Sequence, residues 1–585
     1  MKSLNISPQK QYRVLLFINI TLICASILAI LKSIFISFDI DEGYAIAQAY
    51  RLLKGDRLFS EMWEPHQLSS FASAFFMLPF LIITNGNTTG IIIYLRIIGS
   101  LIHILIGFWF YFAAKRQFNT TTSLLITLVH INFLPKWVSI PEFEIMHYWA
   151  VCILFLALFS WSKQTHKRRF LLLDSIALWC AIMCYPTMII LYPAYVGAIF
   201  CLSPKNHSAK WSSFLCFTLP LCILGITFLG YLLSYMTFSE LLTNISCILM
   251  DESHSSSLVH RCTEYLREMI SFCIMMLKYM GISFIPAYCI CKYLSKKQNK
   301  HYRSFRLFLV TLLLFSITLM SMKQMIFAVL GNVNQFYLYF RFLVISLMGM
   351  VCYYLCRKDN GVFVLLGIVP GFLSVLASAA ITNMTLEIAL ARVYIAVMAS
   401  CFIVCTTIQK NNYQNFILKN LVYGTTVIFL LSLLMSKLLL VRVTGCIPIS
   451  IKMHMAFVTD GPAAGLLLKE ELAQIYNENN SFLKENISSE DCVLYFGCEN
   501  IYYLTINANI STPSVQGTAV FNEMYLKYYE YLPEKLPNVV IIDKTFDENP
   551  DYYYSHQNQI LLDWITEEFK NASVIETANL IIYRK

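Results

Sequence analysis

The chain has 585 residues, of which 57% are hydrophobic and only 14% are charged. A soluble protein would carry about a quarter charged residues, so the composition excludes an ordinary soluble enzyme and favours a polytopic helical membrane protein. Residues 442–585 carry a net charge of −9 and the remainder carries +18, an asymmetry that indicates membrane topology and not nucleic-acid binding.

The apolar runs predict thirteen membrane-spanning helices. The first run follows a basic N-terminal tail and lacks a small-residue cleavage site, so we expect a retained helix with a cytoplasmic N-terminus. An odd number of spans then places the C-terminus outside. The expected spans are 14–36, 90–113, 120–138, 147–161, 169–184, 186–202, 212–236, 266–294, 307–330, 337–356, 361–381, 391–408 and 421–441.

The basic residues support this orientation. The loops placed inside hold 20 Lys and Arg, whereas the outer loops before residue 442 hold four: Arg51, Lys54, Arg57 and Arg261. The alternative, in which the short apolar run 68–84 is a true span, would invert everything downstream. The basic residues decide against this inversion, because it would move most of them to the outside. We therefore expect 68–84, and the amphipathic stretch 44–53, to be helices at the membrane surface within a first outer loop, 37–89.

Residues 442–585 differ from the membrane part, 1–441, and predict one small extracytoplasmic α/β domain. A helical pattern runs from about 461 to 480, and strand-like apolar runs lie at 492–497, 539–542 and 580–583. Cys492 and Cys498 could pair or remain two free thiols. The chain has no CxxC pair, no Cys/His metal spacing and no nucleotide-binding glycine loop.

Acidic residues gather in two of the outer loops. Asp39, Asp41 and Glu42 follow the first span; we interpret Asp39 as a solvated helix end and the other two as functional. A carboxylate at a membrane boundary is partly desolvated, which raises its pKa and its strength as a base. Glu142 and Glu144 could converge on the same cavity. One acid could act as general base on an acceptor hydroxyl, and another could orient the acceptor or hold a divalent cation.

Arginines lie near the outer ends of several spans. Arg96 and Arg392 each neighbour a tyrosine and could bind a phosphate, although an interfacial arginine can also simply reach the lipid headgroups. Arg341 is a weaker candidate. His66 and His147 are more often structural than ligands.

Several motifs resemble those of the GT-C membrane glycosyltransferases, in the branch of the protein O-mannosyltransferases and the lipid A aminoarabinose transferase. The first outer loop carries Asp41-Glu42-Gly43-Tyr44, then Leu53-Lys54-Gly55-Asp56-Arg57-Leu58-Phe59, then Glu64-Pro65-His66. Arg96-Ile97-Ile98-Gly99-Ser100 resembles the family's Arg-led second span, and Tyr185-Pro186 resembles its kinked helix pair. The thirteen-span topology with an outer C-terminal domain is similar too.

The resemblance implies a GT-C fold and a sugar donor carried on a polyprenyl phosphate, used outside a bacterial plasma membrane without a required cofactor. Asp41 matches the catalytic acid and Glu42 its neighbour; Arg96 and Arg392 would hold the donor phosphate, and Tyr44, Glu64 and His66 would line the site. The C-terminal region does not resemble a β-trefoil, so the acceptor stays open among envelope glycan, lipid and protein. A transporter or flippase of lipid-linked glycans is the rival, but such proteins usually carry internal repeats, and we find none.

Overall fold

The computed structural model describes residues 8–38, 40–133, 138–163, 167–248, 258–296, 302–331, 335–356, 360–380, 386–410, 416–442, 446–448, 454–497, 499–516, 522–544 and 559–585. Asp39 and Cys498 lie outside the described residues, so the interpretation of Asp39 and the pairing of Cys498 stay predictions.

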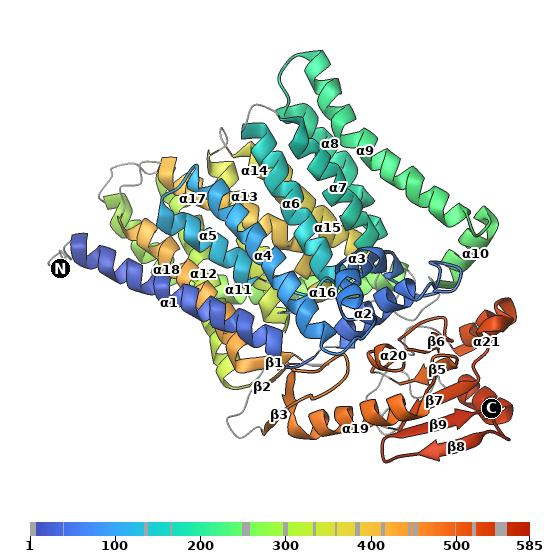
Figure 1. Ribbon diagram of the computed structural model, residues 1–585. Helices are drawn as coiled ribbons and strands as arrows, with labels where there is room; N and C mark the ends of the chain where they lie inside the picture. Colours follow the sequence, from blue (N-terminus) through green and yellow to red (C-terminus); the bar gives the residue numbers. More distant parts are fainter. Residues whose placement is uncertain are drawn as a thin grey trace.

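Long apolar helices form a bundle that makes up most of the molecule (Figure 1). Among the described residues, nine helices are long and apolar enough to cross a membrane. Each predicted span overlaps a helical segment, and residues 134–137 of the span 120–138 lie outside the described residues. The count of thirteen stays a prediction, because four of these segments are shorter or less apolar than the nine. The segments are α1 (Pro8–Phe35), α4 (Ile91–Lys115), α5 (Thr120–Asn132), α6 (Phe143–Lys163), α7 (Arg168–Cys184), η1 (Pro186–Ile190) with α8 (Leu191–Leu202), α9 (His207–Leu233), α11 (Leu258–Lys296), α12 (Tyr302–Val329), α13 (Gln335–Cys356), α14 (Gly361–Phe363) with η2 (Val364–Ile368) and α15 (Val369–Ala379), α16 (Leu386–Leu390) with η3 (Ala391–Val393) and α17 (Tyr394–Lys410), and α18 (Phe416–Leu439).

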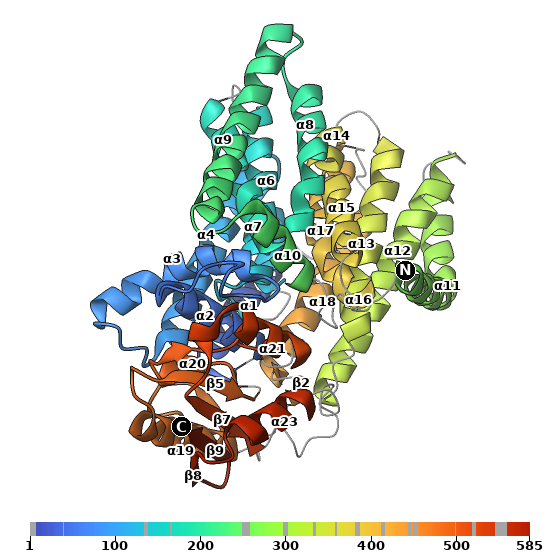
Figure 2. The same cartoon turned by 90° about the vertical axis from the view of Figure 1, so that its right-hand side faces the viewer.

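Burial orders these helices from centre to edge. In the most apolar 18-residue stretch of α6, 94% of the residues are buried. The share is 78% for Ile388–Gln409, which contains most of α17, and only 17% for α9. An apolar helix that stays exposed must face lipid. The bundle core is therefore built around α6 and α17, and α9 lies at its edge, followed by the short α10 (Phe238–Ile248), as Figure 2 shows.

The first outer loop holds two helices with different surroundings. In α3 (Gln67–Ile83), Phe71 and Phe75 are exposed while Ser70 and Ser73 are buried against the protein, as expected for a lipid-facing helix at the membrane. In α2 (Ile40–Leu53), by contrast, residues 42–51 are all buried. The sequence correctly predicts a helix at 44–53, but the expectation that it lies exposed at the membrane surface is wrong, because the C-terminal region covers α2.

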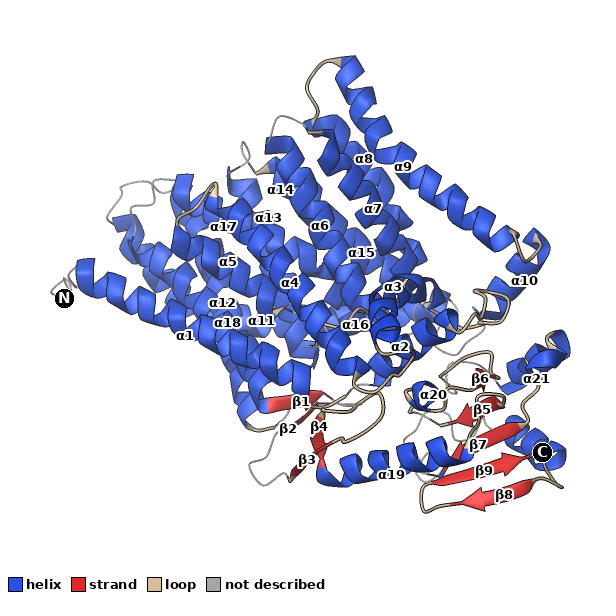
Figure 3. Ribbon diagram, in the orientation of Figure 1, coloured by secondary structure: helices blue, strands red, loops and turns tan. Residues whose placement is uncertain are grey.

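The C-terminal region contains a five-stranded sheet of order β6-β5-β7-β9-β8 (Figure 3). β6, β5 and β7 are parallel, and β9 runs antiparallel to both β7 and β8. This is the α/β domain that the sequence predicts. Its elements, with two short hairpin pairs before the sheet, are β1 (Leu440–Arg442), β2 (Cys446–Pro448), β3 (Met455–Phe457), β4 (Leu467–Lys469), α19 (Glu470–Asn486), β5 (Cys492–Phe496), α20 (Tyr502–Thr505), β6 (Asn509–Ile510), α21 (Asn522–Tyr531), η4 (Pro533–Lys535), β7 (Val539–Asp543), α23 (Gln559–Glu568), β8 (Ser573–Glu576) and β9 (Leu580–Arg584).

Backbone hydrogen bonds join the C-terminal region to one end of the bundle. The Ser37 amide donates to Leu467 at 3.1 Å, and the Gly90 amide donates to Gly461 at 3.0 Å. Ser37 follows α1 and Gly90 precedes α4, so both contacts lie at the end of the bundle where α2 begins with the acidic pair Asp41 and Glu42 (Figures 1 and 2). The first outer loop and the C-terminal domain therefore share one face of the molecule.

Candidate functional site

The acidic motif opens helix α2. Asp41 and Glu42 lie in its first turn, where the helix dipole favours negative charge. Asp41 is partly exposed, whereas Glu42 is only 2% exposed. Gly43 fits closely, because a Cβ there would lie 3.1 Å from the Phe38 ring and 3.6 Å from the Ile501 amide nitrogen. The C-terminal domain thus touches the motif directly.

Glu42 forms a buried two-pronged ion pair with Arg96 of α4. Arg96 Nε donates to Oε1 at 2.9 Å and Nη2 donates to Oε2 at 2.6 Å. The other guanidinium hydrogens go to the end of α1: Nη1 donates to the carbonyls of Ser33 and Ile34, and Nη2 to that of Ser37. All five Arg96 donors are engaged, so the predicted contact of Arg96 with a donor phosphate does not fit this geometry.

The second outer loop packs on α4 beside this ion pair. A Cβ at Gly99 would lie 2.1 Å from the Ser139 carbonyl oxygen, so only glycine allows the approach. Glu142 precedes α6 and accepts from the amides of Glu144 and Ile145 at 3.1 and 3.0 Å. These bonds cap the helix. With 1% exposure, Glu142 does not fit the predicted role of a reacting acid.

Glu144 and Arg392 meet as a second ion pair. Arg392 Nη1 lies 3.2 Å from Glu144 Oε1, and both side chains are about one tenth exposed. Arg392 also donates to the Tyr185 hydroxyl and to the Ile388 carbonyl. Its Nε has no hydrogen-bond partner, and neither does Nε2 of the buried His147. Arg392 Nε and His147 Nε2 are thus two nitrogens without a hydrogen-bond partner in the neighbourhood of the Glu144 carboxylate.

Aromatic contacts connect the two ion pairs. The Tyr44 hydroxyl donates to the Pro65 carbonyl at 2.6 Å, which places α2 beside His66. His66 stacks on Phe143 with ring centroids 4.0 Å apart and meets the Tyr185 ring edge-on at 5.2 Å. His66 thus contacts Phe143, the neighbour of Glu144 in the chain, and Tyr185, which bonds Arg392, while Tyr44 bonds the residue before His66.

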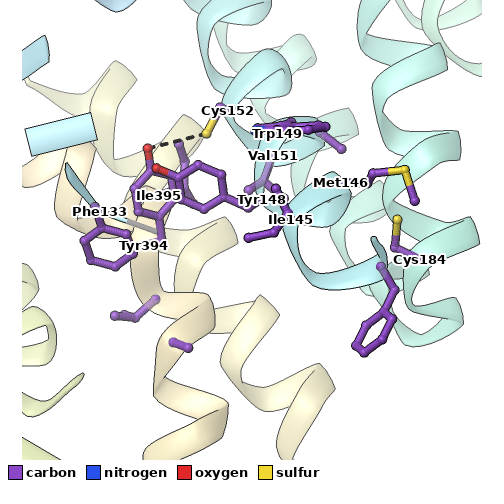
Figure 4. Close-up of a cluster of buried hydrophobic side chains, with 14 of the residues drawn as sticks. Phe133, Ile145, Met146, Tyr148, Trp149, Val151, Cys152, Cys184, Tyr394 and Ile395 are labelled. Atoms are coloured by element: carbon purple, nitrogen blue, oxygen red, sulfur yellow. Dashed lines mark hydrogen bonds between the residues drawn. The ribbon is translucent and has the colours of Figure 1, made fainter. Parts of the chain in front are cut away.

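A tightly packed cluster supports this group from the bundle side (Figure 4). The rings of Tyr148 and Tyr394 lie 3.9 Å apart, and that of Phe133 lies 4.5 Å from Tyr394. The Tyr394 hydroxyl lies 2.6 Å from His130 Nδ1 and 3.5 Å from Cys152 Sγ. Since Tyr394 directly follows η3 and Tyr148 lies in the second turn of α6, this packing holds Arg392 and Glu144 in register.

Glu64 lies elsewhere than predicted. It is fully buried, and its Oε2 accepts from the Ser514 hydroxyl and the Val515 amide, both at 3.1 Å. Burial raises the pKa of Glu64 to about 7, against the opposing effect of Arg51, whose Nη1 is 3.7 Å away. Glu64 therefore joins the first outer loop to the C-terminal domain, and the prediction that it lines the acceptor site does not fit.

Three residues of this region were not among the predicted catalytic, phosphate-binding or site-lining residues, although His147 was expected to be structural. Tyr185 and His147 stand beside Arg392, and Arg51 is buried between Asp56 and the Tyr528 hydroxyl of the C-terminal domain. For Tyr185, the Tyr185-Pro186 pair was the sequence signal that could have marked it. Nothing in the sequence marks Arg51, because its partners come from distant segments. Among the described residues, no group of three or more His, Cys, Asp or Glu could hold a metal ion.

Fold and site together define a polytopic helical membrane protein whose C-terminal α/β domain covers an acidic and basic cluster at one end of the bundle. No protein-family model and no curated protein sequence matches the chain. Among solved structures it is similar to an Archaeoglobus fulgidus oligosaccharyltransferase in complex with Zn and sulfate, with a TM-score of 0.45, 9% identity, and coverage of 91% of this chain and 69% of that one.

Two further structures are similar at 9% identity. One is the archaeal oligosaccharyltransferase AglB from Archaeoglobus fulgidus with an inhibitory peptide and a dolichol-phosphate, with a TM-score of 0.45 and coverage of 97% and 73%. The other is ArnT from Cupriavidus metallidurans in the apo state, with a TM-score of 0.43 and coverage of 96% and 97%. With TM-scores below 0.5, the chemistry of this chain is inferred from its own residues.

Proposed function

We propose that this protein is a GT-C membrane glycosyltransferase that transfers a sugar from a polyprenyl-phosphate donor to an acceptor hydroxyl. The observation that supports this proposal is the Asp41-Glu42-Gly43-Tyr44 motif at a helix N-terminus, where Arg96 pairs with Glu42 and the Tyr44 hydroxyl bonds the carbonyl of Pro65, beside His66. A carboxylate and an incompletely engaged guanidinium on one face suit a base and an anion-binding group.

In the proposed reaction, Asp41 accepts the proton of the acceptor hydroxyl. The hydroxyl oxygen forms a bond to the anomeric carbon while the bond to the lipid phosphate breaks, and the phosphate leaves with that electron pair. A single displacement of this kind inverts the anomeric centre. Arg392, whose Nε has no partner, would stabilise the charge that develops on the leaving phosphate.

The contacts divide the remaining roles. Glu42 and Arg96 would position Asp41 by fixing the start of α2 between α1 and α4. Tyr44 and His66 would line the acceptor side, and Glu144 would orient Arg392. A divalent cation on the acidic residues is an optional part of the proposal. We place the reaction on the extracytoplasmic face of a bacterial plasma membrane, with an envelope glycan, lipid or protein as acceptor.

The test is sugar transfer from a radiolabelled polyprenyl-phosphate donor in membranes that hold each variant at matched protein level. Asp41→Asn keeps the size of the side chain but removes the base, so transfer should fall by about 10²- to 10⁴-fold. Asp39→Asn is the matched control and should retain activity. If Asp41→Asn stays fully active, the chemistry is not in this loop; if the wild type moves the donor across the membrane without transfer, the rival transporter function holds.

A further inference from the structure

A groove between α7 and α9 lies at the end of the bundle away from the C-terminal domain (Figures 1 and 2). Helix α7 ends at Cys184, next to Tyr185 of the candidate site, and it begins at Arg168, about 25 Å away at a rise of about 1.5 Å per residue. Helix α9 begins at the same end, since Arg168 Nη2 donates to the Ser212 hydroxyl at 3.2 Å. The groove is therefore separate from the proposed site of sugar transfer.

One part of this groove is basic. Its lining there includes Arg168 and Arg169 of α7 and His207 of α9, and no acidic side chain is among the described residues that line it. Both arginines are exposed, and neither forms an ion pair with a described residue. Arg168 bonds the Ser212 hydroxyl, and the Arg169 guanidinium lies over the Phe170 ring at 5.2 Å. Two positive charges are thus available to a negatively charged ligand.

The rest of the groove is apolar and faces the lipid. Leu215 and Leu219 of α9 line it and are exposed, and so does Leu172, one turn after Arg168 on α7. Apolar side chains exposed on a membrane-spanning helix meet acyl chains, which are as apolar as leucine. The volume of the whole groove, about 770 Å³, is within the range of about 300–1,000 Å³ that is typical of ligand sites.

Trp211 lies between the basic and the apolar parts. It is 46% exposed, and its Nε1 donates to His207 Nε2 at 3.1 Å, which holds the indole near the start of α9. Leu215 and Leu219 follow it by four and eight positions, so the three side chains form one stripe along the helix. A tryptophan in this position is typical of the depth of the lipid headgroups. The two arginines therefore lie at the level of the lipid phosphates.

We propose that this groove binds a glycerophospholipid of the surrounding bilayer whose head carries a net negative charge, such as phosphatidylglycerol. Its phosphate lies between Arg168 and Arg169, and its acyl chains lie along Leu172, Leu215 and Leu219. Basic pockets between membrane helices suit such heads. A zwitterionic head binds less well, because it brings its own cation to two arginines without acidic partners. The lipid is a component of the membrane and not a substrate, so the proposal holds whether or not the protein transfers sugars.

The experiment uses Trp211 as a reporter in the full chain, reconstituted into phosphatidylcholine bilayers that contain a small share of phosphatidylglycerol. In one preparation only the phosphatidylglycerol has brominated acyl chains, which quench nearby tryptophans; in the other, an equal share of the phosphatidylcholine is brominated instead. The Trp211 signal is the difference between the wild type and Trp211→Phe. We expect phosphatidylglycerol to be enriched at Trp211 by about five-fold for each of the two arginines. About 1 M NaCl should reduce the enrichment, because the Debye length falls to about 3 Å.

Three variants separate charge from packing. Arg168→Gln/Arg169→Gln should abolish the enrichment of phosphatidylglycerol and spare quenching by phosphatidylcholine. The matched control is Lys115→Gln/Arg116→Gln, which removes two exposed charges at the same end of the bundle and should keep the enrichment. Ser212→Ala removes the hydrogen bond from Arg168 but no charge, so it should keep the enrichment too.

The proposal fails if the two brominated lipids quench the Trp211 signal equally in the wild type. It also fails if the enrichment survives in Arg168→Gln/Arg169→Gln, or if it is unchanged at about 1 M NaCl, an arm that needs no variant. Glycerol 3-phosphate in the buffer should leave the quenching by brominated phosphatidylglycerol unchanged. Displacement of the lipid by this soluble head group would instead make the groove a site for soluble anions.

Discussion

Arg96 and Arg392 lie on the same face of the molecule but meet different surroundings. Arg96 donates all five of its hydrogen bonds to Glu42 and to three backbone carbonyls, and it is 1% exposed. Arg392 bonds Glu144, Tyr185 and Ile388 and keeps Nε unengaged. At the scale of the residue, Arg96 has a structural role, and Arg392 is the better candidate to bind an anionic group.

Replacing Arg96 should therefore lower the stability of the protein more than it directly affects sugar transfer. Arg96→Met removes the buried cation that pairs with Glu42, and breaking a buried ion pair in this way costs about 3–5 kcal/mol. The double variant Glu42→Gln/Arg96→Met should recover part of that loss. Thermal unfolding of the purified variants measures both effects. A normal melting temperature for Arg96→Met, with donor use lost, would instead restore a role of Arg96 at the donor phosphate.

At the scale of the element, Gly99 controls how closely α4 and the second outer loop approach. A Cβ in Gly99→Ala would fall 2.1 Å from the Ser139 carbonyl oxygen, so the loop must move and carry Glu144 away from Arg392. Sugar transfer should drop at least about ten-fold, since small displacements of positioning groups are costly. Gly197→Ala, where nothing lies within 4 Å, is the matched control and should retain transfer. Equal transfer by both variants would show that this loop does not position the site.

At the scale of the whole molecule, Glu64 makes the docking of the C-terminal domain sensitive to pH. Burial raises the pKa of Glu64 from 4.5 to about 7, so the folded protein binds this proton more tightly than the unfolded chain. Stability from this group is present below pH 4.5 and is lost as the pH rises towards 7. The melting temperature of the wild type should therefore fall more steeply than that of Glu64→Gln between pH 5 and 7. Parallel curves would contradict this.

Orientation across the membrane is a property of the whole chain. With thirteen spans, position 410 is cytoplasmic and position 560 is external, as the basic residues predict. Cysteines introduced at Lys410 and Ile560 should react differently with an impermeant thiol reagent in intact cells, measured as labelling above the wild-type background. Labelling at 410 and not at 560 would reverse the orientation.

The sequence by itself determined the helical bundle, its apolar spans and the α/β character of residues 442–585, because hydropathy and periodicity are local properties. It also marked Asp41, Glu144, Arg392 and His66. Only the tertiary structure decided which partner each carboxylate of the two outer loops has. Glu42 bonds Arg96, Glu64 bonds Ser514 and Val515, and Glu142 caps its own helix. Ion pairs and burial depend on segments far apart in the chain, so carboxylates that look alike in sequence end in different roles.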